Sequence, residues 1–241
     1  MLGFAPQGRD GEAAQTPRDL GAFVTNPISL RPRRPAARPA CIAYAGGFVL
    51  HTGLPNEGLR RVLARHEARW ARSHLPIIVH LIADRPDETR QMVGMLEGAE
   101  NVMAAELGFA PLLTADILRL TVELCRGELP LICSLPREQV LGLGPRLIEE
   151  GAAAISFAPP RGAVPDKRLE SSPDGANELV TGRLFGPSLL PQTLELVRNC
   201  AKLGLPVIGG GGIWKDEDIG SVLGAGAIAA QVDAWHWLPA A

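Results

Sequence analysis

The sequence predicts an α/β fold built on a parallel sheet, in the form of a TIM-type (β/α)8 barrel. Short apolar runs alternate with amphipathic stretches of helical spacing from about residue 55 onward, which is typical of α/β proteins. These runs are apolar throughout, as strands covered on both faces require. The length of 241 residues is close to the roughly 250 of a single barrel. We therefore expect residues 1–241 to form one barrel domain.

Taken in order, the apolar runs give seven strands, separated by helices. The expected strands are 20–30, 75–84, 101–109, 129–135, 152–158, 205–210 and 227–235. The expected helices are 57–73 (with Asn56 as cap), 87–99, 114–127, 137–151 (broken near Gly144-Pro145), 187–204 and 215–226. A closed barrel has eight strands, so we expect its first strand to be missing or atypical.

Two segments interrupt the repeat of strand and helix. Residues 31–50 are first rich in proline and arginine and then alternate in polarity, which predicts a loop followed by a hairpin. Residues 158–187 are rich in Pro, Gly and Asp and follow a strand, which predicts a long loop on the active-site face. A surface excursion without a function is the alternative for the second segment. For the arginines at 31–38, a solvated loop or contact with an acidic ligand or partner is expected.

Composition excludes several classes of protein. Lys and Arg number 24 against 26 Asp and Glu, so a nucleic-acid partner or a charged membrane surface is not expected. No run of 18 apolar residues predicts a membrane span, and the N-terminus lacks the pattern of a signal peptide. The four cysteines form no CxxC pair, so we expect reduced thiols, a cytoplasmic location and no metal site.

A glycine turn at 209–212 is the strongest local signal of function. It ends a predicted strand and precedes a predicted helix, where backbone N–H groups and the helix dipole favour an anion. Gly209, Gly211 and Gly212 are therefore candidates to hold a phosphate group. A tight turn without a ligand is the alternative.

The order of several segments carries a family resemblance. TNPISLRPRRPAARP (25–39), GLPNEG (53–58), GRLFGPSLLP (182–191), LPVIGGGGIWKDED (205–218) and AIAAQV (227–232) follow one another as in the family's pattern. The chain in this respect resembles the class 1 dihydroorotate dehydrogenases, which are FMN-binding barrels that oxidise dihydroorotate to orotate in pyrimidine biosynthesis. The resemblance implies a flavoprotein oxidoreductase in which Gly186, Gly209, Gly211 and Gly212 contact FMN.

The chain departs from the family at the residues that carry its chemistry. The two family lysines are replaced by Asn26 and Ser134, and the asparagine for the pyrimidine is replaced by Leu50. Gly108 stands at another asparagine place, and the loop after it has no Cys or Ser to act as base. Further departures are Ala158 for the asparagine of the sixth strand and Asp233 for a glycine beside the phosphate. Dihydroorotate oxidation by the family mechanism is therefore expected to be altered or lost.

Other polar residues near the predicted strand ends are candidates for chemistry. His80 and Glu106 lie on neighbouring strands and suit an acid/base pair or part of a metal site, while a hydrogen-bonded core histidine is the alternative. Cys133 is either a displaced nucleophile or a buried thiol, and Ser134 adjoins it. Asp233 and His236, with Glu106, are a further arrangement that suits a divalent cation.

Three functions remain open at this point. The first is the flavoprotein oxidoreductase that the resemblance implies. The second is a non-catalytic degenerate barrel, a pseudoenzyme that acts as a partner or regulatory subunit. The third is a barrel that binds a small phosphorylated metabolite. A small molecule or a flavin is the expected ligand in each catalytic or binding case, and both homo- and hetero-oligomers stay open. An unclosed barrel would also expose the edges of strands 20–30 and 227–235.

Overall fold

The main sheet has the seven predicted strands. The computed structural model describes residues 20–165 and 179–232. All seven strands of this sheet are parallel and run in the order β1-β4-β5-β6-β7-β10-β11. Their bounds are β1 Phe23–Val24, β4 Ile77–Ile82, β5 Val102–Gly108, β6 Leu131–Leu135, β7 Ala154–Phe157, β10 Val207–Gly210 and β11 Ala229–Gln231. Each lies inside the segment in which it was expected.

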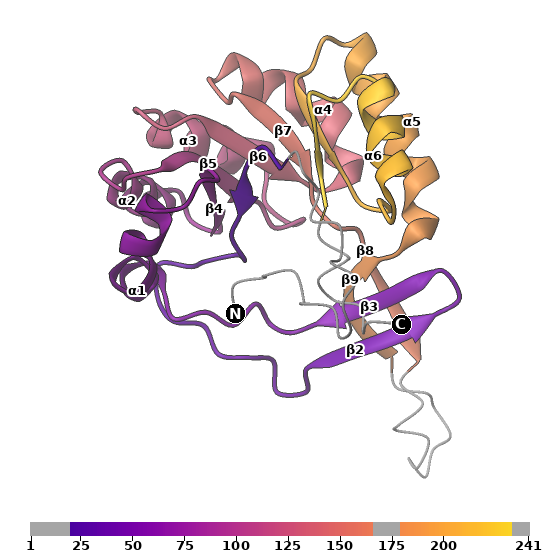
Figure 1. Ribbon diagram of the computed structural model, residues 1–241, viewed down its shortest axis with the longest axis horizontal. Coiled ribbons are helices and arrows are strands. Elements are labelled where there is room, and N and C mark those ends of the chain that lie inside the picture. Colours follow the sequence, from indigo (N-terminus) through magenta and orange to yellow (C-terminus); the bar gives the residue numbers. More distant parts are fainter. Residues whose placement is uncertain (1–19, 166–178, 233–241) are drawn as a thin grey trace.

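Helices follow the strands and cover the outer side of a curved sheet (Figure 1). They are α1 Leu59–Ala71, α2 Pro86–Leu96, α3 Ala115–Cys125, α4 Arg137–Glu149, α5 Leu190–Lys202 and α6 Asp216–Gly224, with a 3-10 turn η2 at Pro187–Leu189. Strands β1 and β11 stand at the two ends of the sheet, and no ladder joins them within the described residues. The predicted α/β barrel-like fold is confirmed, in an open form.

The two faces of the sheet differ in size and in chemistry. Outward side chains such as Val79, Leu107 and Ile155 pack with the helices into the main core. Inward side chains of the same strands form a small apolar cluster that comprises Ala104, Ile132 and Ala154, with Ile78 and Ile208 packed against it. Because side chains alternate along a strand, the positions two residues further on also face inward. These positions lie toward the carboxyl ends of the strands and define the candidate site.

A second, antiparallel sheet has the order β2-β3-β9-β8. Strands β2 Ala40–Tyr44 and β3 Gly47–His51 form the hairpin expected within 31–50. The segment 158–187, which we expected to be a long loop, begins and ends with strands β8 Arg161–Pro165 and β9 Leu179–Phe185. Pairing with β3 and stacking of Phe48 on Phe185, with ring centroids 5.3 Å apart, hold this polar stretch in strand form.

Two details of the helices also differ from expectation. Helix α4 runs from Arg137 to Glu149 with Pro145 inside it, so the break expected near Gly144-Pro145 is wrong. Gly58, not Asn56, precedes the first turn of α1. The Asn56 side chain instead accepts from the Gly58 N–H at 2.9 Å and so shapes the turn before the helix. No helix in the described ranges is long and apolar enough to cross a membrane.

Candidate functional site

A buried carboxylate and an imidazole meet on the inner face of the sheet. His80 on β4 and Glu106 on β5 are register partners, and His80 Nδ1 lies 2.5 Å from Glu106 Oε2. Ser156 on β7 donates its hydroxyl to Glu106 Oε1, also at 2.5 Å. A further hydrogen bond reaches Glu106 from Gln231 on β11. Four strands thus contribute to one polar network, which we call the Glu106 network: His80, Glu106, Ser156 and Gln231.

Glu106 remains a carboxylate although its side chain is only 3% exposed. Burial is the largest single effect and on its own raises the pKa of Glu106. The charge of His80 and the hydrogen bonds from His80, Ser156 and Gln231 lower the pKa, and together they outweigh the effect of burial. The net result is a pKa below the ordinary value for glutamate. An ionised carboxylate can only accept hydrogen bonds, so His80 Nδ1 must carry the proton between them. The other ring nitrogen, Nε2, is then free to take or give a proton.

The backbone and one glycine fix the position of the His80 ring. The His80 N–H donates to Thr25 Oγ1 at 3.0 Å, just after β1, and the His80 carbonyl accepts from the Ile28 N–H. A Cβ at Gly108 would lie 2.4 Å from His80 Nε2, so the imidazole lies over this residue. The ring of His80 therefore occupies the space that a side chain at 108 would need.

The structure separates the other two catalytic candidates. Cys133 points to the helix-covered face, where it is fully buried in the main core. Burial raises the pKa of its thiol to about 12, so it remains protonated at neutral pH. Ser134, the next residue, faces inward and is 4% exposed. Its register partners are Gly108 and Ser156, which places it beside the Glu106 network.

The glycine turn after β10 has two kinds of glycine. Gly209 faces the helices, because a Cβ there would lie 2.4 Å from Val222 of α6. Gly211 and Gly212 adopt φ values of 95° and 86°, which side chains disfavour. A Cβ at Gly212 would also lie 2.1 Å from the backbone nitrogen of Leu190. Within the described residues, neither the N–H of Gly211 nor that of Gly212 donates a hydrogen bond.

Arg137 brings a positive charge to this turn, and we did not single it out from the sequence. Its Nη2 donates to the Gly210 carbonyl at 2.7 Å and to Thr193 Oγ1 at 2.9 Å. Two other nitrogens, Nε and Nη1, are buried without a hydrogen-bond partner in the described structure. This burial lowers the pKa of Arg137. Its position in the sequence could have pointed to it, because Arg137 is the first residue of the helix that follows β6.

The last predicted cofactor residue, Gly186, lies at the junction of the two sheets. Its φ is 143°, and a Cβ there would lie 2.2 Å from the carbonyl oxygen of Gly46 in the β2–β3 turn. The close approach of two backbones accounts for glycine at this position. At the start of α6, Asp218 accepts from the N–H groups of Trp214 and Lys215 at 2.8 and 3.1 Å. These two donors are therefore already used within the chain.

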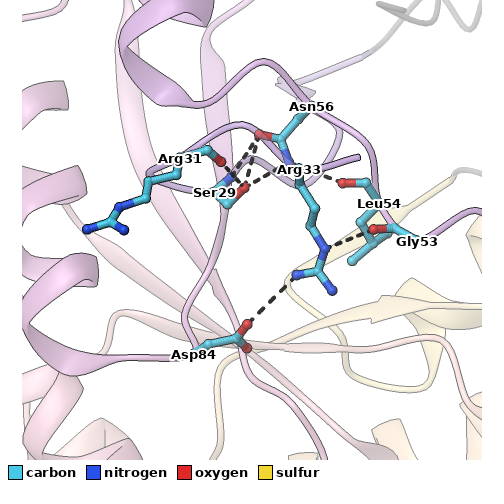
Figure 2. A network of polar contacts seen from close by, with 7 residues as sticks. All are labelled: Ser29, Arg31, Arg33, Gly53, Leu54, Asn56 and Asp84. Carbon is cyan, nitrogen blue, oxygen red and sulfur yellow. Dashed lines mark hydrogen bonds and ion pairs between the residues drawn. The ribbon is translucent and has the colours of Figure 1, made fainter. Parts of the chain in front are cut away.

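Hydrogen bonds and an ion pair near the end of β4 hold the arginine-rich segment in place (Figure 2). Arg33 Nε donates to the Gly53 carbonyl at 2.9 Å, and its Nη1 lies 3.9 Å from Asp84 Oδ2. Asn56 accepts from the Ser29 N–H at 3.2 Å and so joins the two ends of the loop. Leu54, between them, has a φ of 54°. The exposed Arg33–Asp84 pair adds less than about 1 kcal/mol, so its role is to orient the loop.

Metal ligation receives no support from the described residues. Within 20–165 and 179–232, no group of three His, Cys, Asp or Glu side chains could hold a metal ion. Glu106 uses its oxygens in the network above. Asp233 and His236, the partners proposed for it from the sequence, lie outside the described residues.

The fold defines the class as an open α/β barrel with a polar network on the inner face of its sheet, and comparison with known proteins agrees with this fold. In a crystal structure of dihydroorotate dehydrogenase from Eimeria tenella, in complex with ferulenol, a chain superimposes with a TM-score of 0.67. That match is 17% identical and covers 86% of this chain and 68% of that one, so it shows the fold alone. No family model matches the chain.

Curated relatives establish the family. The catalytic subunit of dihydroorotate dehydrogenase B (NAD(+)) from Thermodesulfovibrio yellowstonii is 31% identical over 229 residues, covering 88% of this chain and 75% of that protein. The same subunit from Methanopyrus kandleri is 30% identical over 237 residues, covering 89% and 74%. The one from Pelobacter propionicus is 28% identical over 228 residues. The chain belongs to the dihydroorotate dehydrogenase family, as its sequence motifs indicated.

Proposed function

We propose that this chain is an FMN-binding oxidoreductase in which His80 takes the place of the family's loop base. The observation that carries the proposal is the Glu106 network, set on the inner face of a barrel of this family. An imidazole held by a carboxylate through Nδ1 is a common arrangement for a general base, with Nε2 as the reactive atom. The family supplies the reaction type, which is oxidation of a CH–CH unit.

The residues around the glycine turn fit the phosphate of FMN. Gly211 and Gly212 offer two free N–H groups, and Arg137 has two buried nitrogens without an acceptor. A phosphate oxygen is the acceptor that a guanidinium and backbone amides prefer. Asp218 accepts from the Trp214 and Lys215 N–H groups just before α6 and brings a negative charge there, so we assign the phosphate to the glycines and Arg137 rather than to that helix. When bound, FMN would supply a two-electron acceptor.

The work of the protein's own groups is then to hold the substrate and to move one proton. His80 Nε2 accepts a proton from the substrate carbon, and its Nδ1–H stays on Glu106 throughout. The carboxylate stabilises the imidazolium that forms, and Ser156 keeps the carboxylate in place. Transfer of a hydride from the adjacent carbon to the two-electron acceptor that FMN would supply would complete the carbon–carbon double bond, so that the proton goes to His80 and the electron pair to the flavin. The His80 side chain is 19% exposed, so its proton would then pass to water.

A non-catalytic subunit is the second candidate function. Strands β1 and β11, which pair on only one side within the described residues, favour it, because an open edge is a surface on which another chain can pair. The relatives are described as catalytic subunits, which points to assemblies of more than one chain. This candidate predicts that no flavin is bound.

Titration with FMN separates the two candidates. We expect the wild-type chain to quench flavin fluorescence at micromolar concentrations. Gly211→Asp, which puts a negative charge and a strained side chain at the turn, should abolish binding. Gly94→Ala, on an open surface of α2, is the matched control and should bind as the wild type does. The His80→Gln variant should bind FMN normally, because His80 is proposed to take a proton from the substrate and not to hold the phosphate of FMN. Failure of the wild-type chain to bind FMN at about 100 µM would favour the non-catalytic subunit.

A further inference from the structure

Arg137 stands where a positive charge is costly for the fold. It is the first residue of α4, and a cation there opposes the positive end of the helix dipole. No side chain caps this end of the helix. The Nε and Nη1 atoms of Arg137 are buried and have no hydrogen-bond partner in the described structure. A buried donor without an acceptor lowers the free energy of unfolding, and a charged donor lowers it more than a neutral one.

The groups around the guanidinium offset this cost only in part. Nη2 donates to the Gly210 carbonyl and to Thr193 Oγ1, and the ring centroid of Phe157 lies 5.9 Å from the guanidinium carbon. All three of these groups are neutral. Glu138, the acid of the first helical turn, is exposed, and the ion pairs within the described residues do not include Arg137. Arg137 is therefore a cation that an added anion would stabilise.

The same guanidinium contacts the glycine turn after β10. A Cβ at Gly211 would lie 2.3 Å from Arg137 Nη2, so the lack of a side chain at 211 makes room for the arginine. Thr193 Oγ1 donates to the Gly211 carbonyl at 2.7 Å and so ties the turn to α5. Both Gly211 and Arg137 are partly exposed, which leaves this part of the turn open to an ion from solution. The two orphaned nitrogens and the turn thus belong to one place in the fold.

We infer that Arg137 and the glycine turn bind a phosphate group on their own, so that inorganic phosphate stabilises the chain and the ligand class is phosphate monoesters. The inference rests on the proposed function for the assignment of the phosphate to this turn, but it does not need the flavin ring. A phosphate dianion supplies both the acceptor oxygens and the negative charge that the guanidinium favours. A ligand that binds only the folded chain raises its stability as the ligand concentration rises. Arg137 is then a binding residue that lowers the stability of the ligand-free fold.

Thermal unfolding with inorganic phosphate as the probe tests this inference. The melting temperature is measured without phosphate and with phosphate up to about 50 mM, against sodium chloride at equal ionic strength. We expect phosphate, and glycerol 3-phosphate as a small monoester, to raise the melting temperature of the wild-type chain beyond the effect of chloride.

Three variants assign the effect to the charge of Arg137. Arg137→Met removes the charge, and Thr193 Oγ1, 3.3 Å from the Gly210 carbonyl, remains as a donor to that carbonyl. Without phosphate this variant should unfold at the same temperature as the wild type or at a higher one, and it should bind phosphate at least about tenfold more weakly. Arg137→Lys keeps the charge and should keep part of the response. Gly94→Ala, on an open surface of α2, is the matched control and should respond as the wild type does.

The outcomes separate this inference from the proposed function. A chain that binds FMN but gains no stability from phosphate relative to chloride overturns the inference alone. A chain that is stabilised by phosphate through Arg137 but does not bind FMN supports the inference and overturns the proposed function. Arg137→Met overturns the inference if it keeps the full phosphate response, or if it unfolds well below the wild type without phosphate, because the arginine is then a structural contact. Equal loss of the response in Arg137→Lys and Arg137→Met also overturns the role of the charge.

Discussion

At the scale of single residues, the fit between Gly108 and His80 is the feature that most distinguishes this site. The imidazole lies where a Cβ at 108 would be, and it reaches Glu106 only from that position. A residue with a side chain at 108 and the present His80 are therefore mutually exclusive. This pairing gives a physical reason for glycine at 108, because the space is filled by a side chain from the neighbouring strand.

Gly108→Ala tests this fit. The added methyl group should displace the imidazole and break the His80–Glu106 contact, which lowers the free energy of unfolding by about 1–3 kcal/mol. Urea unfolding measures the loss, and the proton on His80 Nδ1 should disappear from its hydrogen-bonded position in the NMR spectrum. Gly94→Ala has open space around it and should be neutral or stabilising. An undisturbed Nδ1 proton in Gly108→Ala would show that the ring does not need this space.

The pH dependence of stability should report on Glu106. Its pKa in the folded chain is below the ordinary value of 4.5, so the ionised form stabilises the fold. This contribution is fully present above the unfolded-state pKa and is lost as the pH falls through the folded one. At pH 7 we expect Glu106→Gln to be less stable than the wild type by about 1–3 kcal/mol, and the difference should shrink below pH 4.5. Urea midpoints across this range check it, and a constant difference at all pH values would contradict the assignment.

At the scale of elements, the sequence predicted the strands better than their faces. All seven parallel strands were found because each is apolar throughout, as burial on both sides requires. The same property hid which way each residue points, so inward His80 and outward Cys133 could not be told apart beforehand. Strands β8 and β9 were missed because they lie at the two ends of a segment rich in Pro, Gly and Asp and are partly exposed, and because pairing with β3 is a long-range effect. Arg137 was missed because the partners of a side chain cannot be predicted from one helix boundary.

Neighbouring glycines on β10 offer a matched test of how the helices pack. A Cβ at Gly209 would lie 2.4 Å from Val222, whereas at Gly210 the nearest atom is 3.5 Å away. Gly209→Ala should therefore overpack the contact with α6 and lower the free energy of unfolding by about 1–3 kcal/mol. Gly210→Ala should have almost no effect or a small stabilising one. Equal effects of the two substitutions in urea unfolding would mean that the faces of β10 are assigned the wrong way round.

At the scale of the whole molecule, the chain has the parallel sheet and covering helices of its family's fold. A buried carboxylate–imidazole pair lies on the inner face of this sheet. The sheet remains open between β1 and β11 in the described part of the chain. The two candidate functions for this fold are flavin-dependent oxidation and a non-catalytic role in an assembly with another chain.

Retention of FMN through gel filtration tests the central claim most directly. The chain is incubated with excess FMN and separated from free flavin, and absorbance at 350–500 nm gives the amount bound for each chain. The proposed function predicts about one FMN for each chain, and a large loss in Gly211→Asp, because the turn holds the phosphate. A colourless protein peak for the wild-type chain would contradict the claim that this barrel is a flavoprotein.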